Sequence, residues 1–193
     1  MIILDKHREY NSAEKAHLVI EPDTTSYGTA AMYNIEKEGL SKYMDIRNDY
    51  SDKILATLFL ENQRIQYAYV DTTKQFDVVL QDFYMINKIL DVGGVIIFDD
   101  CGGGWPGIQR VARFINTLPH YKVLAGHGKS NPSFRNKCFQ ALGFFLVKLI
   151  PYKKILYPTI SFKSDRELVL DFNCIAFQKV TEDNRNWNWD KTF

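Results

Sequence analysis

The stretch from Ile65 to Phe114 constrains the fold more than any other part of this 193-residue chain. Two apolar runs, Ile65–Val70 and Gly94–Phe98, each end at acidic residues, namely Asp71, Asp99 and Asp100. Apolar residues between the runs recur at helical spacing, at Phe76, Leu80, Phe83, Ile86 and Leu90. Strand, helix and strand in this order predict a parallel crossover unit. Ligands of open parallel sheets bind beyond the carboxyl ends of the strands, so the unit brings three carboxylates to that edge.

Strand and helix patterns alternate through most of the remaining chain. Residues 1–15 have a helical pattern, His17–Ile20 a strand pattern, and Ser51 is suited to cap a helix over Asp52–Leu60. A long connection precedes a last strand over Leu168–Phe177. This alternation predicts an α/β fold, a doubly wound and mostly parallel sheet with a C-terminal antiparallel strand. The length predicts a single domain, residues 1–180, followed by an irregular tail, residues 181–193.

Charge is unevenly distributed, although the net charge of the chain is only +1. From Tyr121 to Lys163 there are eight Lys or Arg residues and no Asp or Glu. The rest of the chain therefore holds 16 basic and 23 acidic residues, a net charge of −7. We expect a basic, aromatic insertion over about residues 126–163 within an otherwise acidic domain.

Three widely spaced cysteines provide neither a disulfide framework nor a paired metal-binding motif. A reducing compartment is the simplest interpretation, and we expect a cytoplasmic protein. The N-terminus, MIILDKHREY, has no signal-peptide core. The apolar cluster Ala141–Ile150 is too short to cross a bilayer.

Four segments, in the order HLVIEP, NDYS, YAYVD and IIFDD, resemble class I S-adenosylmethionine-dependent methyltransferases. The similarity is greatest to the small-molecule O-methyltransferase group, whose L-x-x-G-G-x-x-x-x-D-D pattern is similar to DVGGVIIFDD here. The resemblance covers roughly His17 to Ala125 and implies a Rossmann-like fold. It also implies S-adenosylmethionine as cofactor and a small hydroxylated acceptor, such as a sugar or a secondary metabolite.

The resemblance also implies roles for individual residues. Glu21 corresponds to the acid that binds the cofactor ribose, where a carboxylate accepts hydrogen bonds from two adjacent hydroxyl groups. The adenine pocket corresponds to Asp49, Tyr50 and Ser51. The carboxylates that hold Mg²⁺ or Mn²⁺ in cation-dependent members correspond to Asp71, Asp99 and Asp100. Asp71 and Lys74 are candidate catalytic residues, with the identity of the general base left open.

One departure from the family is the glycine-rich loop that follows its first strand. Only sixteen residues precede His17, and none of them is glycine. We therefore expect a sheet without the family's first strand, whose absence would leave unpaired edges at the centre. The alternative function is a non-catalytic or truncated methyltransferase-like binding module that does not hold the cofactor and forms a homodimer. A metal-dependent glycosyltransferase that uses the Asp pair ranks lower.

The basic segment from residue 121 to residue 163 has three open interpretations. The simplest is a solvated helix face whose apolar side packs on the sheet. The others are a site for an anionic substrate and peripheral contact with an acidic membrane, to which interleaved aromatic residues would contribute. No nucleic-acid-binding motif accompanies the charge, so we expect no nucleic-acid partner.

Overall fold

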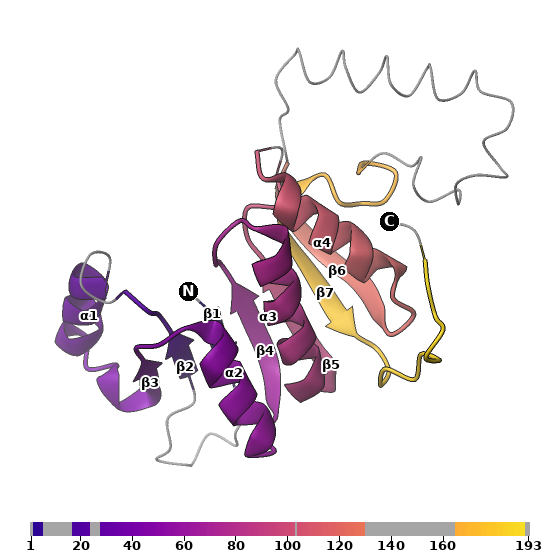
Figure 1. Ribbon diagram of the computed structural model, residues 1–193. Coiled ribbons are helices and arrows are strands. Elements are labelled where there is room, and N and C mark those ends of the chain that lie inside the picture. The colour runs from indigo at the N-terminus through magenta and orange to yellow at the C-terminus, as the bar shows by residue number, and fades with distance from the viewer. Residues whose placement is uncertain (1, 6–16, 24–27, 103, 130–164, 192–193) are drawn as a thin grey trace, which may run out of the picture.

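The computed structural model describes residues 2–5, 17–23, 28–102, 104–129 and 165–191 (Figure 1). The elements in chain order are β1 (Ile2–Asp5), β2 (His17–Ile20), α1 (Gly28–Lys37), the 3₁₀ turn η1 (Ser41–Tyr43), β3 (Met44–Arg47), α2 (Ser51–Leu60), β4 (Ile65–Val70), α3 (Phe76–Ile89), β5 (Leu90–Phe98), α4 (Pro106–Thr117), β6 (Tyr121–Lys129) and β7 (Phe172–Lys179). Most of the predicted insertion, residues 126–163, lies outside the described residues.

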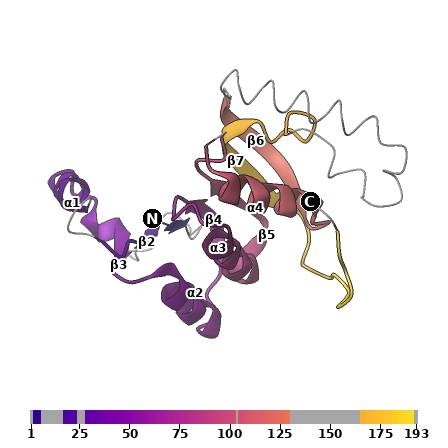
Figure 2. The same ribbon diagram turned by 45° about the horizontal axis from the view of Figure 1, so that its top comes forward.

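The strands of the described chain form one seven-stranded mixed sheet in the order β3-β2-β1-β4-β5-β7-β6. Strand β2 pairs in parallel with β3, and β4 with β5. Strand β7 runs antiparallel between β5 and β6, which confirms the predicted antiparallel C-terminal strand. The predicted α/β class is confirmed, because α2, α3 and α4 lie side by side on one face of this sheet (Figures 1 and 2).

The centre of the sheet differs from the prediction of a helix over residues 1–15 and a vacant first-strand position. Residues Ile2–Asp5 form β1, which pairs antiparallel with both β2 and β4. Ile2 lies opposite Ile20 on one side and Val70 on the other. The hydrogen-bonding edges of β2 and β4 are thus paired by a short strand of reversed direction, which removes the cost of unpaired central edges.

The core lies between the sheet and helices α2 to α4. Alternate residues of β5, Ile96 and Phe98, are buried against this layer, as are Ile175 and Phe177 of β7. Side chains on successive strand positions point to opposite faces, so this alternation directs every second side chain into the layer of α2 to α4. The ring of Phe83 in α3 lies 6.3 Å from that of Phe98, centroid to centroid.

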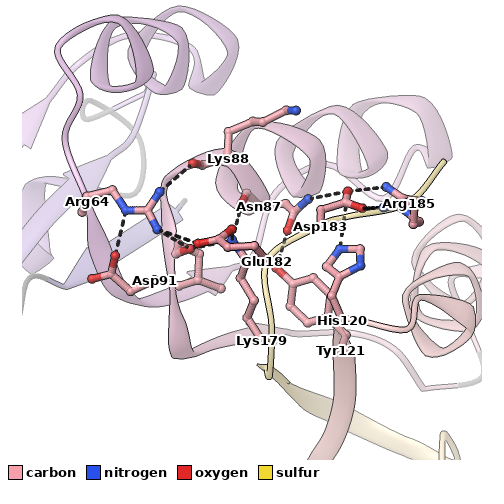
Figure 3. Close-up of polar contacts among 11 residues, drawn as sticks. Arg64, Asn87, Lys88, Asp91, His120, Tyr121, Lys179, Glu182, Asp183 and Arg185 are labelled. Atoms are coloured by element: carbon pink, nitrogen blue, oxygen red, sulfur yellow. Dashed lines mark hydrogen bonds and ion pairs between the residues drawn. The ribbon is translucent and has the colours of Figure 1, made fainter. Parts of the chain in front are cut away.

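The residues after β7 are tied to the amino end of the sheet (Figure 3). The ammonium group of Lys179 donates to the carbonyl oxygens of Asn87 at 3.1 Å and Leu90 at 2.9 Å. Its third close partner is Glu182 Oε2 at 2.8 Å. This connection anchors the first part of the predicted irregular tail to the end of α3 and the start of β5. No helix among the described residues is both long and apolar enough to cross a membrane.

Candidate functional site

The sequence-predicted site residues lie at the ends of four strands that run in the same direction. Glu21 follows β2, Asp49 and Tyr50 lie between β3 and α2, which begins at Ser51, Asp71 follows β4, and Asp99 and Asp100 follow β5. All of these residues therefore lie at the carboxyl edge of the sheet, where open α/β folds bind ligands. The strand β1 separates β2 from β4, which places Glu21 and Asp71 two strand spacings apart, roughly 10 Å.

Glu21 continues the pairing of β2 with β3 beyond the strand itself. Its backbone N–H donates to the carbonyl oxygen of Arg47 at 3.1 Å, and its carboxylate accepts from the backbone N–H of Asp23 at 3.1 Å. The carboxylate is thus fixed by the turn at the end of β2. It is half-buried at the edge where a ribose diol would bind.

Asp49 and Tyr50 form the outer part of the predicted adenine pocket. Asp49 Oδ1 accepts from the backbone N–H of Tyr50 at 2.8 Å and from Lys53 Nζ at 2.9 Å. The hydrogen bond from Lys53 lowers the pKa of Asp49 below its ordinary value. Tyr50 is 65% exposed, so its ring is open to a planar ligand.

Ser51 is the first residue of α2 and does not cap it, contrary to the prediction. The N-cap is Tyr50, whose side chain makes no capping hydrogen bond. The Ser51 hydroxyl instead donates to Asp82 Oδ1 at 2.7 Å. A residue of the predicted adenine pocket is therefore bonded to an acid that lies inside α3.

Lys74 lies between two of the predicted metal ligands. Its Nζ is 2.7 Å from Asp71 Oδ1 and 2.8 Å from Asp100 Oδ2. Asp100 has a φ of 56°, in the left-handed region that few non-glycine residues adopt. Burial lowers the pKa of Lys74, but its hydrogen bonds to Asp100 and Asp71 outweigh burial and raise the pKa overall. Lys74 is therefore positively charged at neutral pH.

Asp99 is enclosed by hydrogen-bond donors. Its Oδ2 accepts from the Tyr69 hydroxyl at 2.6 Å. Its Oδ1 accepts from Cys174 Sγ at 2.8 Å, the Asp100 backbone N–H at 2.8 Å and Asn173 Nδ2 at 3.3 Å. Burial raises the pKa of Asp99, but the hydrogen bonds from Cys174, Tyr69 and the Asp100 backbone lower it overall.

In this arrangement the three predicted metal ligands do not converge on a cation position. Asp71 and Asp100 share the Lys74 ammonium group, and both oxygens of Asp99 have protein donors. No cluster of three or more His, Cys, Asp or Glu side chains that could hold a metal occurs among the described residues. The positive charge between Asp71 and Asp100 is that of a lysine.

The residues at the edge fit the adenosine half of S-adenosylmethionine better than its methionine half. Glu21 would supply a carboxylate for the ribose hydroxyls, and Tyr50 would supply an accessible aromatic ring. In the described part of the chain, β1 runs opposite to the other central strands and ends at the amino edge, opposite His17. The carboxyl end of this strand therefore points away from the candidate site.

Three contributors to this edge were not predicted from the sequence: Asp82, Tyr69 and Cys174. Asp82 could have been found, because it is an acid on the apolar face of α3, next to Val79 and Phe83. Tyr69 and Cys174 could not, because their contact with Asp99 depends on the pairing of β5 with β4 and β7.

Comparison with known proteins identifies the family of the chain. Residues 2–101, just over half of the chain, match the family model described as a methyltransferase domain. Among solved structures, a protein from Clostridium thermocellum assigned as an rRNA-methylase matches with a TM-score of 0.45 and 11% identity. The match covers 55% of this chain and 63% of that one, so the chain spans less than two thirds of its length. Curated proteins give no match. Because this family model covers more than half of the chain, the chain belongs to the class I S-adenosylmethionine-dependent methyltransferases.

Proposed function

We propose that the protein transfers the methyl group of S-adenosylmethionine to a hydroxyl group of a small acceptor, such as a sugar or a secondary metabolite. The observation that carries the proposal is the alignment of acids at one sheet edge, with Glu21 after β2, Asp71 after β4 and Asp99 after β5. Family membership supports methyltransferase chemistry. The acceptor class is inferred from the polar groups around Lys74.

The adenosine half of the cofactor would bind across the ends of β2 and β3. Glu21 would accept hydrogen bonds from the ribose hydroxyls, and Asp49, Tyr50 and Ser51 would surround the adenine. When bound, the cofactor supplies an electrophilic methyl group on a sulfonium sulfur. Negative charge from Asp71 and Asp99 at the same edge favours a cationic ligand there.

The acceptor would bind beside Lys74. The ammonium group would donate to the acceptor oxygen, while the carboxylate of Asp71 takes the hydroxyl proton as the oxygen–methyl bond forms and the sulfur–methyl bond breaks. The products are the methyl ether and S-adenosylhomocysteine. Lys74 is the cation of the site in this proposal, so no step is assigned to a metal ion.

Calorimetric titration of the full chain with S-adenosylhomocysteine, with and without Mg²⁺, tests cofactor binding. We expect a micromolar dissociation constant that Glu21→Ala raises at least tenfold, the loss of about 1.4 kcal/mol of binding free energy. Glu38→Ala is the matched control, because Glu38 is an exposed acid in the turn after α1. Transfer of a labelled methyl group to a panel of hydroxylated acceptors then tests activity, with Asp71→Asn as the inactive variant.

A second candidate function is a methyltransferase-like binding module that does not hold the cofactor. The observation that favours it is the antiparallel direction of β1, whose carboxyl end lies at the amino edge of the sheet, away from the candidate site. This candidate predicts a folded chain that does not bind S-adenosylhomocysteine. It also predicts a homodimer, which sedimentation measurements would detect. Micromolar binding by the monomer would exclude it.

A further inference from the structure

Asp82 is an acid at a core position of the helix α3. Its side chain is 1% exposed, and it shares the apolar face of the helix with Val79, Phe83 and Ile86. An ionisable group in such a place is costly unless it is hydrogen-bonded. The contacts of Asp82 lie toward the candidate site and explain why it is there.

The hydroxyl group of Ser51, at the start of α2, reaches this carboxyl group. Ser51 comes after the end of β3, and its Oγ donates a hydrogen bond to Asp82 Oδ1 at 2.7 Å. This hydrogen bond favours the charged form of the carboxyl and lowers its pKa, against the effect of burial. Asp82 Oδ2 is buried without a hydrogen-bond partner among the described residues. Burial raises the pKa of Asp82 above its ordinary value, so the acid is held there at a cost.

The bond to Asp82 determines what Ser51 can offer a ligand. A serine hydroxyl has a single hydrogen and two lone pairs. Because the hydrogen is directed at Asp82, the Ser51 oxygen can only accept a further hydrogen bond. Ser51 is partly exposed at the carboxyl edge, where its oxygen would meet a donor on the ligand.

We propose that Asp82 is a positioning residue for the adenine end of the cofactor: it fixes Ser51 as a hydrogen-bond acceptor for the exocyclic amino group. This inference rests on the proposed cofactor binding. It also predicts that the site discriminates between purine bases. A base that carries an oxo group in place of the amino group presents a hydrogen-bond acceptor to the Ser51 oxygen, so a ligand with that base binds more weakly.

The test compares S-adenosylhomocysteine with S-inosylhomocysteine, its deaminated analogue, by calorimetry on the full chain. The wild-type chain is expected to prefer the adenine ligand at least tenfold. Asp82→Ala and Ser51→Ala are each expected to reduce that preference to less than threefold, and the double variant to do no more. Asp82→Asn keeps an acceptor oxygen and is expected to restore most of the preference. Asp77→Asn, an exposed acid on the same helix, is the matched control.

Each alternative outcome identifies what fails. If Asp82→Ala weakens both ligands equally and lowers the melting temperature in proportion, Asp82 has only a structural role and the inference is overturned. Should Asp82→Ala not fold, Ser51→Ala decides alone, because retention of the full preference by that variant contradicts the inference. A wild-type chain that binds both ligands equally overturns the inference but leaves the proposed function intact. A folded chain that binds neither ligand overturns both.

Discussion

Lys179 in β7 donates a hydrogen bond to the carbonyl oxygen of Asn87 in α3, at 3.1 Å, although its side chain is only 1% exposed. The same ammonium group also bonds Leu90 O and Glu182 Oε2 (Figure 3). The carbonyl oxygens at the end of a helix lack partners within that helix and carry partial negative charge. A lysine of the last strand therefore completes the end of α3.

Replacing Lys179 with methionine keeps the length of the stem but removes the buried ammonium donor from the carbonyl oxygens of Asn87 and Leu90. Leu90 O keeps a hydrogen bond from Arg64 Nη2 at 3.2 Å, so the main loss is at Asn87 O. We expect a loss of about 2 kcal/mol or more in the free energy of unfolding, measured by urea denaturation. Glu182→Gln is the control, because Glu182 is 56% exposed and its removal should cost less than about 1 kcal/mol. Equal losses in the two variants would show that the exposed ion pair, rather than the buried carbonyl contacts, stabilises this end of the sheet.

Acid should destabilise the protein in two steps, both at the amino end of the sheet. Burial lowers the pKa of His120, so its ring stays neutral in the folded state below pH 6.5, where the unfolded ring takes up a proton. Stability then falls as the pH falls below 6.5. The hydrogen bond from Arg185 lowers the pKa of Asp183 to about 2, so its contribution is present above pH 3.8 and lost as the pH approaches 2.

Melting temperatures between pH 8 and pH 5 test the first step. His120→Phe keeps a ring against Tyr121, whose ring centroid lies 5.0 Å from that of His120, and should flatten the curve in this range. His127→Gln is the matched control, because His127 is exposed. If the His120 variant retains the full loss of stability between pH 7 and pH 5, another group is responsible.

The crossover unit was predictable because its pattern is local. The apolar period of α3 and the acid that follows each strand lie within a short stretch of sequence, so Phe76–Ile89 and the position of Asp71 follow from spacing alone. Strand β1 was not predictable, because a stretch of four residues is too short to show a hydrophobic period. What makes Ile2–Asp5 a strand is the pair of open edges that β2 and β4 present to it.

The sequence predicted which types of residue lie at the carboxyl edge of the sheet, but not how their side chains pair with one another. Spacing indicated that Asp71, Asp99 and Asp100 share the carboxyl edge of the sheet. It could not indicate that Lys74 reaches both Asp71 and Asp100, because that contact depends on the left-handed backbone at Asp100. The metal interpretation followed from the carboxylates alone, without the lysine that pairs with two of them.

Gly107 fixes the position of the loop that carries Lys74. A β-carbon at residue 107 would overlap the carbonyl oxygen of Lys74 and lie 2.9 Å from the backbone nitrogen of Phe76. We expect Gly107→Ala to push this loop away from α4, to cost about 1–3 kcal/mol of stability, and to speed hydrogen exchange at residues 74–76. Gly104→Ala is the control, because the nearest atom to its β-carbon would lie 3.9 Å away. Unchanged exchange in the Gly107 variant would contradict this prediction.

Removing the charge of Lys74 should create a cation site at the two carboxylates with which it now pairs. Lys74→Met leaves Asp71 and Asp100 without their shared ammonium partner, next to the carboxylate of Asp99. We expect the affinity for Mg²⁺, measured by calorimetry, to rise at least tenfold over the wild-type chain, which corresponds to about 1.4 kcal/mol. The physical reason is that oxygen ligands of a hard cation are freed while a competing positive charge is removed.

The matched control for that experiment is Lys53→Met. The ammonium group of Lys53 lies 2.9 Å from a carboxylate oxygen of Asp49. Unlike the ion pairs of Lys74, this pair is exposed, and among the described residues Lys53 has no second carboxylate in an ion pair. Its removal should leave Mg²⁺ affinity unchanged, because one solvated carboxylate holds a divalent cation weakly. If wild-type chain already binds Mg²⁺ as tightly as the Lys74 variant, the lysine does not occupy the cation position, and the metal-assisted form of the reaction is restored as the better proposal.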